Sequence, residues 1–422
     1  MKFSSAEKKS VKKGTGTESL SLIIDIESGL VRAALVANAP DVAPRVLYTT
    51  SSIIVSRAVK THSADVLQGM VRSLNEVAGN IANTAVPALR ARGVMLPISA
   101  VHCALSSPWV ISKTKTVKVS YEKEIEVTKD VIAKIIDTEH QELKNKFKLE
   151  HDVSSDGAVL EYDLVFIEQK IFEIKLNGYV MTSVYGKRAR EVEVSFAVTV
   201  SSKDILNHIH ESLASHLNNI SIRGIYGVHG EYTEQHHSSL LLQYTAFRNL
   251  MKVRDDYIAA HVHNNLSDII VVRRGICSVL ASFPFGMSTF IKKSSNALNQ
   301  PESLTKSALT MLSDDKLTPA VGEDVATASD PIIREWAAQF FQTLSAVADL
   351  DSLPRTLVLS VHDHFPFFEK ALKDEGKSNP LDITPLDEVL LEKAVSYERG
   401  QDTNALVSMY AFALDPSLHA DL

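Results

Sequence analysis

Two pairs of histidines have a spacing that could hold a divalent metal ion. His261 and His263 are one residue apart, and His362 and His364 repeat this spacing with Asp363 between them. In an extended backbone, side chains two positions apart point to the same side. Imidazoles and a carboxylate are common zinc ligands. His-x-His alone is weak evidence, however, and polar loops can accumulate histidines, so our prediction is that no metal is bound.

Other motifs of common enzymes are absent from the sequence. It has no Gly-x-Ser-x-Gly elbow, no His-Glu-x-x-His helix and no Walker-type glycine loop. His208 and His210 fall on a predicted helix, where residues two apart point to different faces and cannot share a metal. His236 and His237 fall in a predicted polar loop.

Composition excludes further classes. The 422 residues suggest roughly two to four domains. A net charge of −7 argues against a surface that grips nucleic acid. Cys103 and Cys277 alone cannot build a disulfide framework or a cysteine zinc site. No apolar run approaches the roughly 18 residues of a membrane span, and the polar start offers no secretory signal. We expect a cytoplasmic, multi-domain protein.

The first hundred residues predict a β-hairpin followed by a helix. Apolar runs at 20–25 and 30–37 are separated by a short polar turn, and a third strand is predicted at 51–56. Ser63 is a suitable N-cap for a helix with an apolar stripe. A further strand is predicted at 98–107.

Residues 108–190 have the pattern of an inserted unit. The segment 116–120 alternates as a half-buried strand does, and Thr128 is a suitable N-cap for a helix. Further strands are predicted at 159–167, 170–176 and 179–184, the last two joined by the hairpin turn Asn177-Gly178. A strand at 191–200 with one apolar face follows.

The second half begins with another hairpin. Residues 259–286 predict three strands joined by turns, so hairpins lie near the start of both halves, at 20–37 and 258–283. The later elements are helices within 287–350 with a polar break at about 313–330, a buried strand at 355–361 and a helix at 365–376.

This order of elements resembles the actin-like ATPase superfamily, and within it the bacterial cell-division protein FtsA and the type IV pilus protein PilM. The resemblance is carried by residues 25–36, 108–190, 267–286 and 356–372. It implies an α/β, two-domain actin-like (ribonuclease-H-like) fold with an SHS2-type α+β subdomain inserted in domain I.

Composition, element order and the resemblance together predict a division of the chain. The expected parts are a disordered basic tail (1–19), domain I (20–107 and 191–250), the inserted subdomain (108–190), domain II (251–395, with its core at 258–286 and 355–390 and a helical part at about 287–350) and a C-terminal return to domain I (396–422).

In the superfamily, open turns hold nucleotide phosphates between the two domains, because glycine lets backbone N–H groups approach a phosphate. The first turn departs from this pattern. Asp25 stands at the magnesium-side position and Gly29 is kept beside Ser28, but Glu27 replaces a glycine and would repel a phosphate. If the cleft binds no nucleotide, Asp25 ends a strand and Glu27 is an exposed turn carboxylate.

The other two loops depart as well. In the second, His261 stands at the leading aspartate, and His263, Asn264 and Asn265 replace three glycines ahead of Ser267. In the third, Val361, His362 and Asp363 stand where glycines would contact adenine. In the resembled fold both loops line the cleft, which would bring His261, His263, His362 and His364 together. The resemblance therefore implies a degenerate nucleotide site.

We predict a non-catalytic or weakly nucleotide-binding scaffold of the FtsA/PilM type at the cytoplasmic face of the inner membrane. It would act through protein-protein contacts in type IV pilus assembly or cell division, without a cofactor. One alternative is a working actin-like ATPase that binds ATP and Mg²⁺ through altered loops. A metal-dependent hydrolase built on the histidine loops is another.

The resemblance implies a membrane-anchored pilus or division protein as partner, docking through a short peptide, together with self-association. The alternating strand at 116–120 is our candidate edge for strand addition. No nucleic-acid partner is expected. No Lys or Arg follows Arg399, so the segment 404–414 is predicted to pack on domain I. Membrane contact is then indirect or made by the lysines of 1–19.

Overall fold

The computed structural model describes residues 18–39, 42–54, 63–94, 96–151, 163–181, 183–222, 233–250, 256–347, 353–361, 364–378, 380–391, 394–398 and 405–414. Most of the predicted basic tail, the start of the strand predicted at 159–167, and the site candidates His362 and Asp363 lie outside these residues. The chain is mixed α/β, as predicted, and its described part contains sheets of six, five and four strands.

The six-stranded sheet has the order β15-β3-β2-β1-β4-β9. Its strands are β1 (Ser19–Ile26), β2 (Leu30–Ala39), β3 (Val42–Ile53), β4 (Ile98–Leu105), β9 (Thr233–Ser238) and β15 (Ser396–Tyr397). The predicted hairpin is confirmed as β1–β2, whereas β3 begins nine residues before the predicted strand at 51–56. Strand β9 contains His236 and His237, which corrects the predicted loop.

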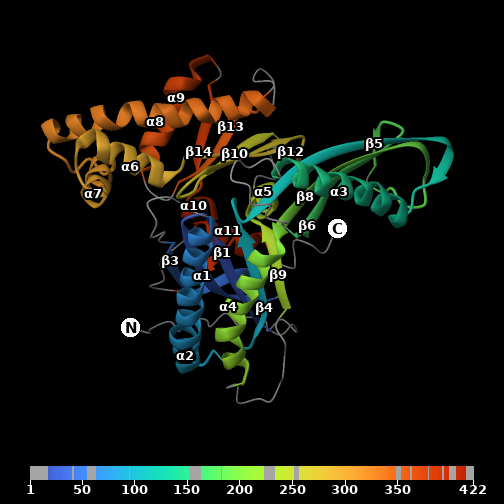
Figure 1. Cartoon of the computed structure of the whole chain (residues 1–422), viewed down its shortest axis with the longest axis horizontal. Coiled ribbons are helices and arrows are strands. Elements are labelled where there is room, and N and C mark those ends of the chain that lie inside the picture. The colour runs from blue at the N-terminus through green and yellow to red at the C-terminus, as the bar shows by residue number, and fades with distance from the viewer. Residues whose placement is uncertain are drawn as a thin grey trace, which may run out of the picture.

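Helices cover both faces of this sheet (Figure 1). One face carries α1 (Ser63–Asn80), the π-helical turn Ile81–Ala85, α2 (Val86–Ala91) and α4 (Lys203–Ile222), and the other carries α5 (Ser239–Leu250), α10 (Glu388–Leu391) and α11 (Ala405–Ala413). Side chains alternate along β1, so Leu22 and Ile24 pack toward α1 and α4. Ile23 packs toward α5 and α11, and Asp25 shares its side of the strand.

The five-stranded sheet has the order β12-β11-β10-β13-β14 and shares the α5 and α11 layer with the first sheet. Its strands are β10 (Tyr257–Val262), β11 (Ser267–Arg273), β12 (Ile276–Phe283), β13 (Thr356–Val361) and β14 (Asp382–Pro385). Its outer face shares a hydrophobic core with the helices α6 (Met287–Leu298), α7 (Glu302–Ser313), α8 (Pro319–Val347) and α9 (Phe365–Glu375). A short 3₁₀ turn, Gly376–Ser378, follows α9.

The polar break predicted at 313–330 is much shorter in the structure. Helix α8 starts at Pro319 and continues through Pro331 to Val347. Val325, Ile333 and Trp336 are buried along one side of it, so the intervening Asp and Thr residues can occupy its other sides. The many polar residues of this segment suggested a loop. In the structure they belong to the exposed sides of an amphipathic helix, whose few apolar residues face the core.

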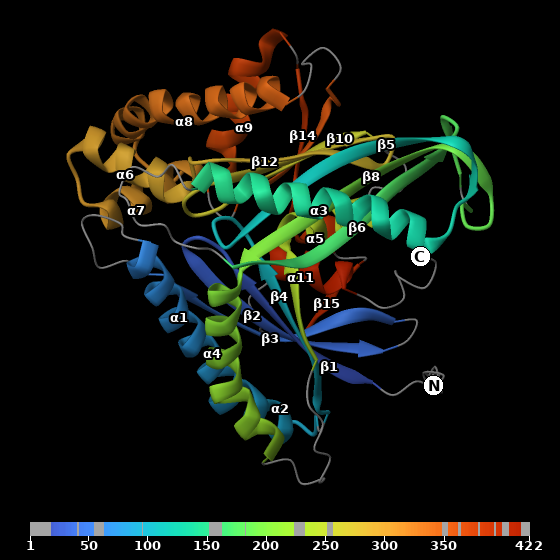
Figure 2. The ribbon, with the colours of Figure 1, turned by 45° about the vertical axis from the view of Figure 1, so that its right-hand side comes forward.

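The four-stranded sheet projects from the other two and carries one long helix on its face (Figures 1 and 2). Its order is β5-β8-β6-β7, and its elements are β5 (Val110–Glu126), β6 (Leu164–Leu176), β7 (Tyr179–Val180), β8 (Arg188–Ser202) and α3 (Lys129–His151). The described part of the strand predicted at 159–167 and the strand predicted at 170–176 form a single strand, β6, because the polar residues between them, Glu168 and Gln169, pair with Thr199 and Val198 of β8.

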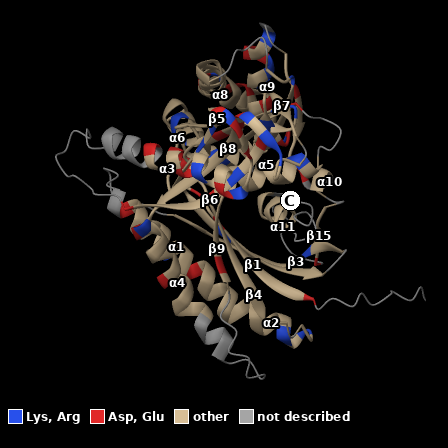
Figure 3. Cartoon of the chain, turned by 90° about the vertical axis from the view of Figure 1, so that its right-hand side faces the viewer, with Lys and Arg blue, Asp and Glu red and all other residues tan. Residues whose placement is uncertain are grey.

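Charged residues of both signs lie on α3 and on this projecting sheet (Figure 3). Lys118 pairs with Glu191 across β5 and β8 at 2.9 Å, and Lys175 pairs with Glu193 across β6 and β8 at 2.7 Å. Such exposed pairs contribute little stability each, so the burial of Val192, Phe196 and their neighbours holds the sheet to α3. Among the helices of the described residues, none combines the length and apolarity that a membrane crossing requires.

His102 on β4 gives the fold a pH dependence. Its Nδ1 lies 3.2 Å from His237 Nε2 on β9, and burial, together with His237, lowers the pKa of His102 to about 4. The unfolded chain therefore gains a proton near pH 6.5 that the folded chain gains only near pH 4. The contribution of His102 to the free energy of unfolding is fully present above about pH 6.5 and is lost as the pH drops toward 4.

We expect roughly 2 kcal/mol of unfolding free energy to be lost over this range, after allowing for the partial exposure of His102. Urea unfolding of the parent chain and of His102→Asn at pH 7 and pH 4.5 measures this contribution as the difference between the two chains, because the effects of Asp25 and His261 are common to both. The variant His102→Asn should show a smaller pH dependence, whereas His208→Asn, which removes an exposed histidine, should retain that of the parent chain. An unchanged pH dependence in His102→Asn would contradict the assignment.

Candidate functional site

The β1–β2 and β10–β11 hairpins have the same register. Asp25 pairs with Arg32 across the first, and His261 pairs with Asp268 across the second. In the turns, the amide of Glu27 donates to the carbonyl of Leu30 and the amide of His263 donates to that of Leu266, both at 2.9 Å. The equivalent positions are therefore Asp25 and His261, Glu27 and His263, and Arg32 and Asp268.

The first hairpin carries a buried ion cluster. Arg32 donates a hydrogen bond to Asp25 Oδ2 at 2.7 Å and another to Glu27 Oε1. Glu27 is 1% exposed, so the expected exposed turn carboxylate is wrong. Trp109, the residue just before β5, donates from Nε1 to the Glu27 carbonyl at 2.9 Å and fixes the turn. This burial could not be predicted from the local sequence, because a Glu-Ser-Gly turn is ordinarily solvated.

The second hairpin places complementary groups against this cluster. His263 Nδ1 lies 3.2 Å from Glu27 Oε2, and His263 Nε2 lies 2.7 Å from Asp268 Oδ2. His261 Nε2 is 3.6 Å from Glu27 Oε1, and the two imidazole rings stack edge to face. Ser282 of β12 also donates to Asp268. Glu27 of the first hairpin thus faces both imidazoles of the second, including His263 at the equivalent position.

The hairpin tips touch each other. Asn265 Nδ2 donates to the Ser28 carbonyl at 3.3 Å. The Asn264 side chain lies so close to Gly29 that a Cβ added at Gly29 would be 2.6 Å from the Asn264 Cβ. Ser288 Oγ donates to Asn264 Oδ1 at 2.6 Å and holds that side chain in place. Side chains therefore occupy the space in which the resemblance places nucleotide phosphates, so the residues present do not fit a triphosphate.

Burial and charge set the protonation of the cluster. Burial, with Glu27 beside it, raises the pKa of Asp25 to about 7. Burial also acts to raise the pKa of Glu27, but Arg32 and His263 outweigh it and hold that pKa well below its ordinary value. Burial opposes charge on His263, yet Asp268 and Glu27 raise its pKa to about 10. Burial and His263 lower the pKa of His261 to about 4.

The structure brings together most of the site residues predicted from the sequence. Asp25, Glu27, Ser28, Gly29, His261, His263, Asn264, Asn265 and Ser267 all lie in or beside the two turns. Ser267 accepts a hydrogen bond from Trp336 Nε1 at 2.9 Å and donates to the Phe285 carbonyl at 2.6 Å, which is a structural role. His364 stands apart from the predicted histidine cluster. Its ring contacts Phe290 and Phe367, whereas the carboxylate beside His261 and His263 is that of Glu27.

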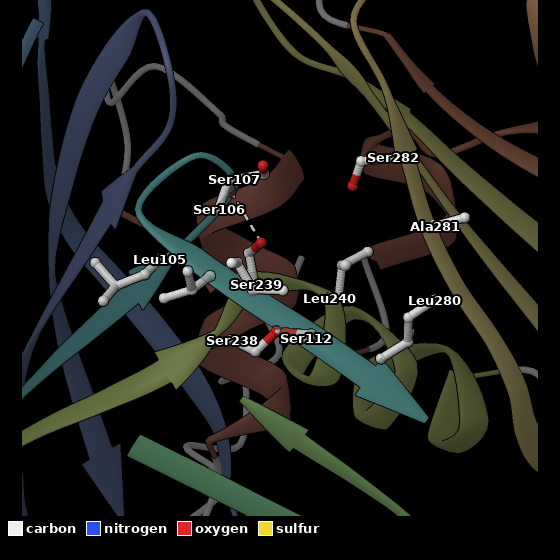
Figure 4. A pocket seen from close by; sticks show the side chains of 12 residues that line it. Leu105, Ser106, Ser107, Ser112, Ser238, Ser239, Leu240, Leu280, Ala281 and Ser282 are labelled. Carbon is white, nitrogen blue, oxygen red and sulfur yellow. Dashed lines mark hydrogen bonds between the residues drawn. The ribbon is translucent and has the colours of Figure 1, made fainter. Parts of the chain in front are cut away.

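Sequence reasoning missed Arg32 and Asp268 as members of the cluster. Aligning the two hairpins residue by residue would have found both, because Arg32 pairs with Asp25 and Asp268 pairs with His261 on the neighbouring strand. It also missed a pocket of about 210 Å³ where the three sheets meet (Figure 4).

The pocket is lined by Leu105, Ser106, Ser107, Val110, Ile111, Ser112, Ser238, Ser239, Leu240, Leu280, Ala281 and Ser282. Ser106 Oγ donates to Ser239 Oγ at 2.8 Å, and Ser112 and Ser238 share a hydrogen bond of the same length. Because these hydroxyls satisfy one another, none is prepared as a nucleophile. The volume is below the roughly 300–1,000 Å³ of typical small-molecule sites.

Comparison with known proteins places the fold. No protein-family model and no curated protein matches the sequence significantly. Among solved structures, a PilM-PilN type IV pilus biogenesis complex is similar with a TM-score of 0.55 and 12% identity, covering 94% of this chain and 98% of that one.

Two further structures cover similar shares at lower scores. The ethanolamine utilization protein EutJ from Carboxydothermus hydrogenoformans has a TM-score of 0.42, with 10% identity over 94% of this chain and 89% of that one. A Bacteroides thetaiotaomicron protein with an actin-like ATPase fold has a TM-score of 0.39, with 8% identity over 93% and 95%. The first similarity confirms the predicted actin-like α/β fold, while the inserted SHS2-type subdomain and the domain boundaries stay predictions.

Proposed function

We propose that this protein is a non-catalytic scaffold of the FtsA/PilM type that acts in type IV pilus assembly, with cell division as the other pathway open to the same architecture. The observation that carries the proposal is the buried contact between the hairpins, where Glu27, His263 and Asn264 lie at the position that the resemblance assigns to nucleotide phosphates. Displacing them would break a buried ion cluster, which is costly. A protein without a nucleotide cycle is left with binding as its means of action.

The fold similarity supports the pathway. The solved structure with a TM-score of 0.55 is a complex of PilM with PilN in type IV pilus biogenesis, so that protein works together with a partner. We infer an equivalent membrane-anchored partner for this chain, presenting a short peptide at the cytoplasmic face of the inner membrane. Self-association remains part of the same proposal.

Strand β5 is the docking edge that we propose. Within the described residues it pairs with β8 alone, and it forms one edge of the four-stranded sheet. Thr114 Oγ1 donates to the Ser278 carbonyl of β12 at 3.2 Å, so the early part of the edge is covered. Residues 116–120 continue beyond that contact with alternating exposure, as a strand that accepts an added strand would.

Calorimetry with Mg-ATP tests the loss of nucleotide binding. We expect no binding tighter than about 100 μM, which corresponds to roughly −5.5 kcal/mol. An ATP-binding protein of the same fold, measured under identical conditions, serves as the positive control. A dissociation constant well below that limit would favour the working ATPase instead.

Gene neighbourhood separates the two pathways. Pilin and pilus-motor ATPase genes beside this one would support pilus assembly. A neighbouring tubulin-like division gene would support cell division.

A peptide-binding experiment tests the docking edge. We expect the cytoplasmic peptide of the neighbouring membrane protein to bind this chain, and we expect binding to be lost when Val117 is replaced by proline, because proline removes a backbone donor from a strand.

A further inference from the structure

The buried contact between the hairpins has the composition of a transition-metal site. Glu27 of the first hairpin and His261 and His263 of the second place ligand atoms within 4.8 Å of one another, and each side chain is at most 3% exposed. The Glu27 oxygens lie 3.2 Å from His263 Nδ1 and 3.6 Å from His261 Nε2. Two nitrogen or oxygen ligands of a tetrahedral zinc ion are about 3.4 Å apart, so little adjustment is needed.

The surroundings of the three ligands match those of metal centres. His263 directs its other ring nitrogen to Asp268 at 2.7 Å, and Glu27 accepts a hydrogen bond from Arg32. Metal-bound histidines commonly donate to a carboxylate in this way, and metal-bound carboxylates are themselves hydrogen-bonded. These contacts fix the orientation of the imidazole and of the carboxylate.

His261 supplies an independent observation. Its side chain is 3% exposed, and neither ring nitrogen has a hydrogen-bond partner among the described residues. A buried polar atom without a partner costs free energy, and such atoms in native proteins often mark a missing ligand. A metal bond to Nε2, which faces Glu27, would satisfy one of the two nitrogens.

The charge of the cluster is compatible with a metal ion. With Asp25, Glu27 and Asp268 ionised, Arg32 charged and both imidazoles neutral, the cluster carries −2, which a divalent ion would neutralise. Without a metal, protons on His263 and Asp25, whose pKa values are raised to about 10 and about 7, neutralise the cluster instead. The ion would therefore bind in exchange for these protons, because an interior tolerates neutral clusters.

We propose that Glu27, His261 and His263 bind one divalent transition-metal ion, with zinc as the first candidate, and that this ion fastens the two hairpins together. The sequence predicted no bound metal and considered only His362 and His364 as further ligands beside His261 and His263. The structure adds Glu27 to this pair, while His362 lies outside the described residues. The proposal is independent of the scaffold role, since zinc and ATP binding are measured separately. The competing occupant of the position between Glu27 and His263 is a proton.

Metal content and thermal unfolding test the proposal on the full chain. We expect about one zinc ion per purified chain, or its uptake after chelator treatment and long incubation with zinc. The unfolding midpoint of the chelator-treated chain should rise by about 3 °C at a hundredfold excess over the dissociation constant. Cobalt in place of zinc should give visible absorption bands of nitrogen and oxygen ligation. No zinc binding, no stabilisation and no cobalt bands in the parent chain would leave the proton as occupant and overturn the proposal.

Two matched variants locate the ion. His261→Gln removes a ligand that has no hydrogen bond to lose and should weaken zinc binding at least a hundredfold. His364→Gln removes another buried histidine, at the start of α9, and should leave zinc affinity within about twofold of the parent chain. Equal zinc affinity in His261→Gln and in the parent chain would mean surface binding and would overturn the assignment, as would loss of binding in His364→Gln alone. Glu27→Gln provides the second ligand variant if His261→Gln fails to fold.

Discussion

Replacing Arg32 with methionine is expected to lower the unfolding free energy by about 3–5 kcal/mol. Arg32 is the cation that contacts both Asp25 and Glu27, and the side chains of all three residues are at most 8% exposed. Methionine fills a similar volume but leaves both carboxylates without their guanidinium partner. Urea unfolding at pH 7.5, with a chelator present so that no metal ion compensates, measures the loss.

Three variants separate charge from packing at this position. Arg32→Lys keeps the charge but cannot bridge two carboxylates with a planar fork, so we expect an intermediate loss. The triple variant Asp25→Asn, Glu27→Gln, Arg32→Met removes all three charges and should recover most of the stability. Arg45→Met removes an exposed arginine whose ion pairs are 3.4 and 3.7 Å long, and should cost less than about 1 kcal/mol. Equal losses at Arg32 and Arg45 would show that the buried cluster is not a principal stabilising contact.

Much of the fold was predictable because many of its strands, turns and helices have recognisable local sequence patterns. The β1–β2 hairpin, the Asn177-Gly178 turn and the apolar face of β8 each follow from spacing within a few residues. The errors concern segments whose secondary structure is determined by contacts with residues distant in the sequence. β6 runs through Glu168-Gln169-Lys170 because β8 pairs along its whole length, and β9 forms from a polar segment because β4 supplies its partner.

The site was predictable in its members but not in its geometry. Asp25, Glu27, His261 and His263 were identified as unusual for phosphate-holding turns, yet sequence gave no way to see that the two turns meet. Their meeting depends on α5 and α11, which pack between the sheets and set their separation. Glu27 was predicted to be exposed because it is charged. In the structure its carboxylate is paired with residues up to 236 positions away, which a local sequence pattern cannot reveal.

Replacing Gly286 with alanine is expected to lower the unfolding free energy by about 2–3 kcal/mol although it adds a single carbon. A Cβ at Gly286 would lie 2.6 Å from the carbonyl oxygens of His263 and Asn264 and from the Leu266 amide nitrogen. All three are backbone atoms, so no side-chain rotation can relieve the contact. The hairpin tip would have to move away from α6, whose first amides donate to the same two carbonyls at 2.9 and 2.7 Å.

This displacement should be visible beyond the loss of stability. Asn264 and Asn265 belong to the displaced hairpin tip, so their contacts with Gly29 and Ser28 should weaken. Amide hydrogen exchange in that turn should therefore become faster. Gly322→Ala is the matched control, because its nearest neighbours are side-chain atoms at 3.5 and 3.7 Å and the position is helical. It should gain about 0.5–1 kcal/mol from helix propensity. If Gly286→Ala unfolds at the same urea concentration as the parent chain, the tip of the second hairpin is free to move and cannot be what closes the space between the two turns.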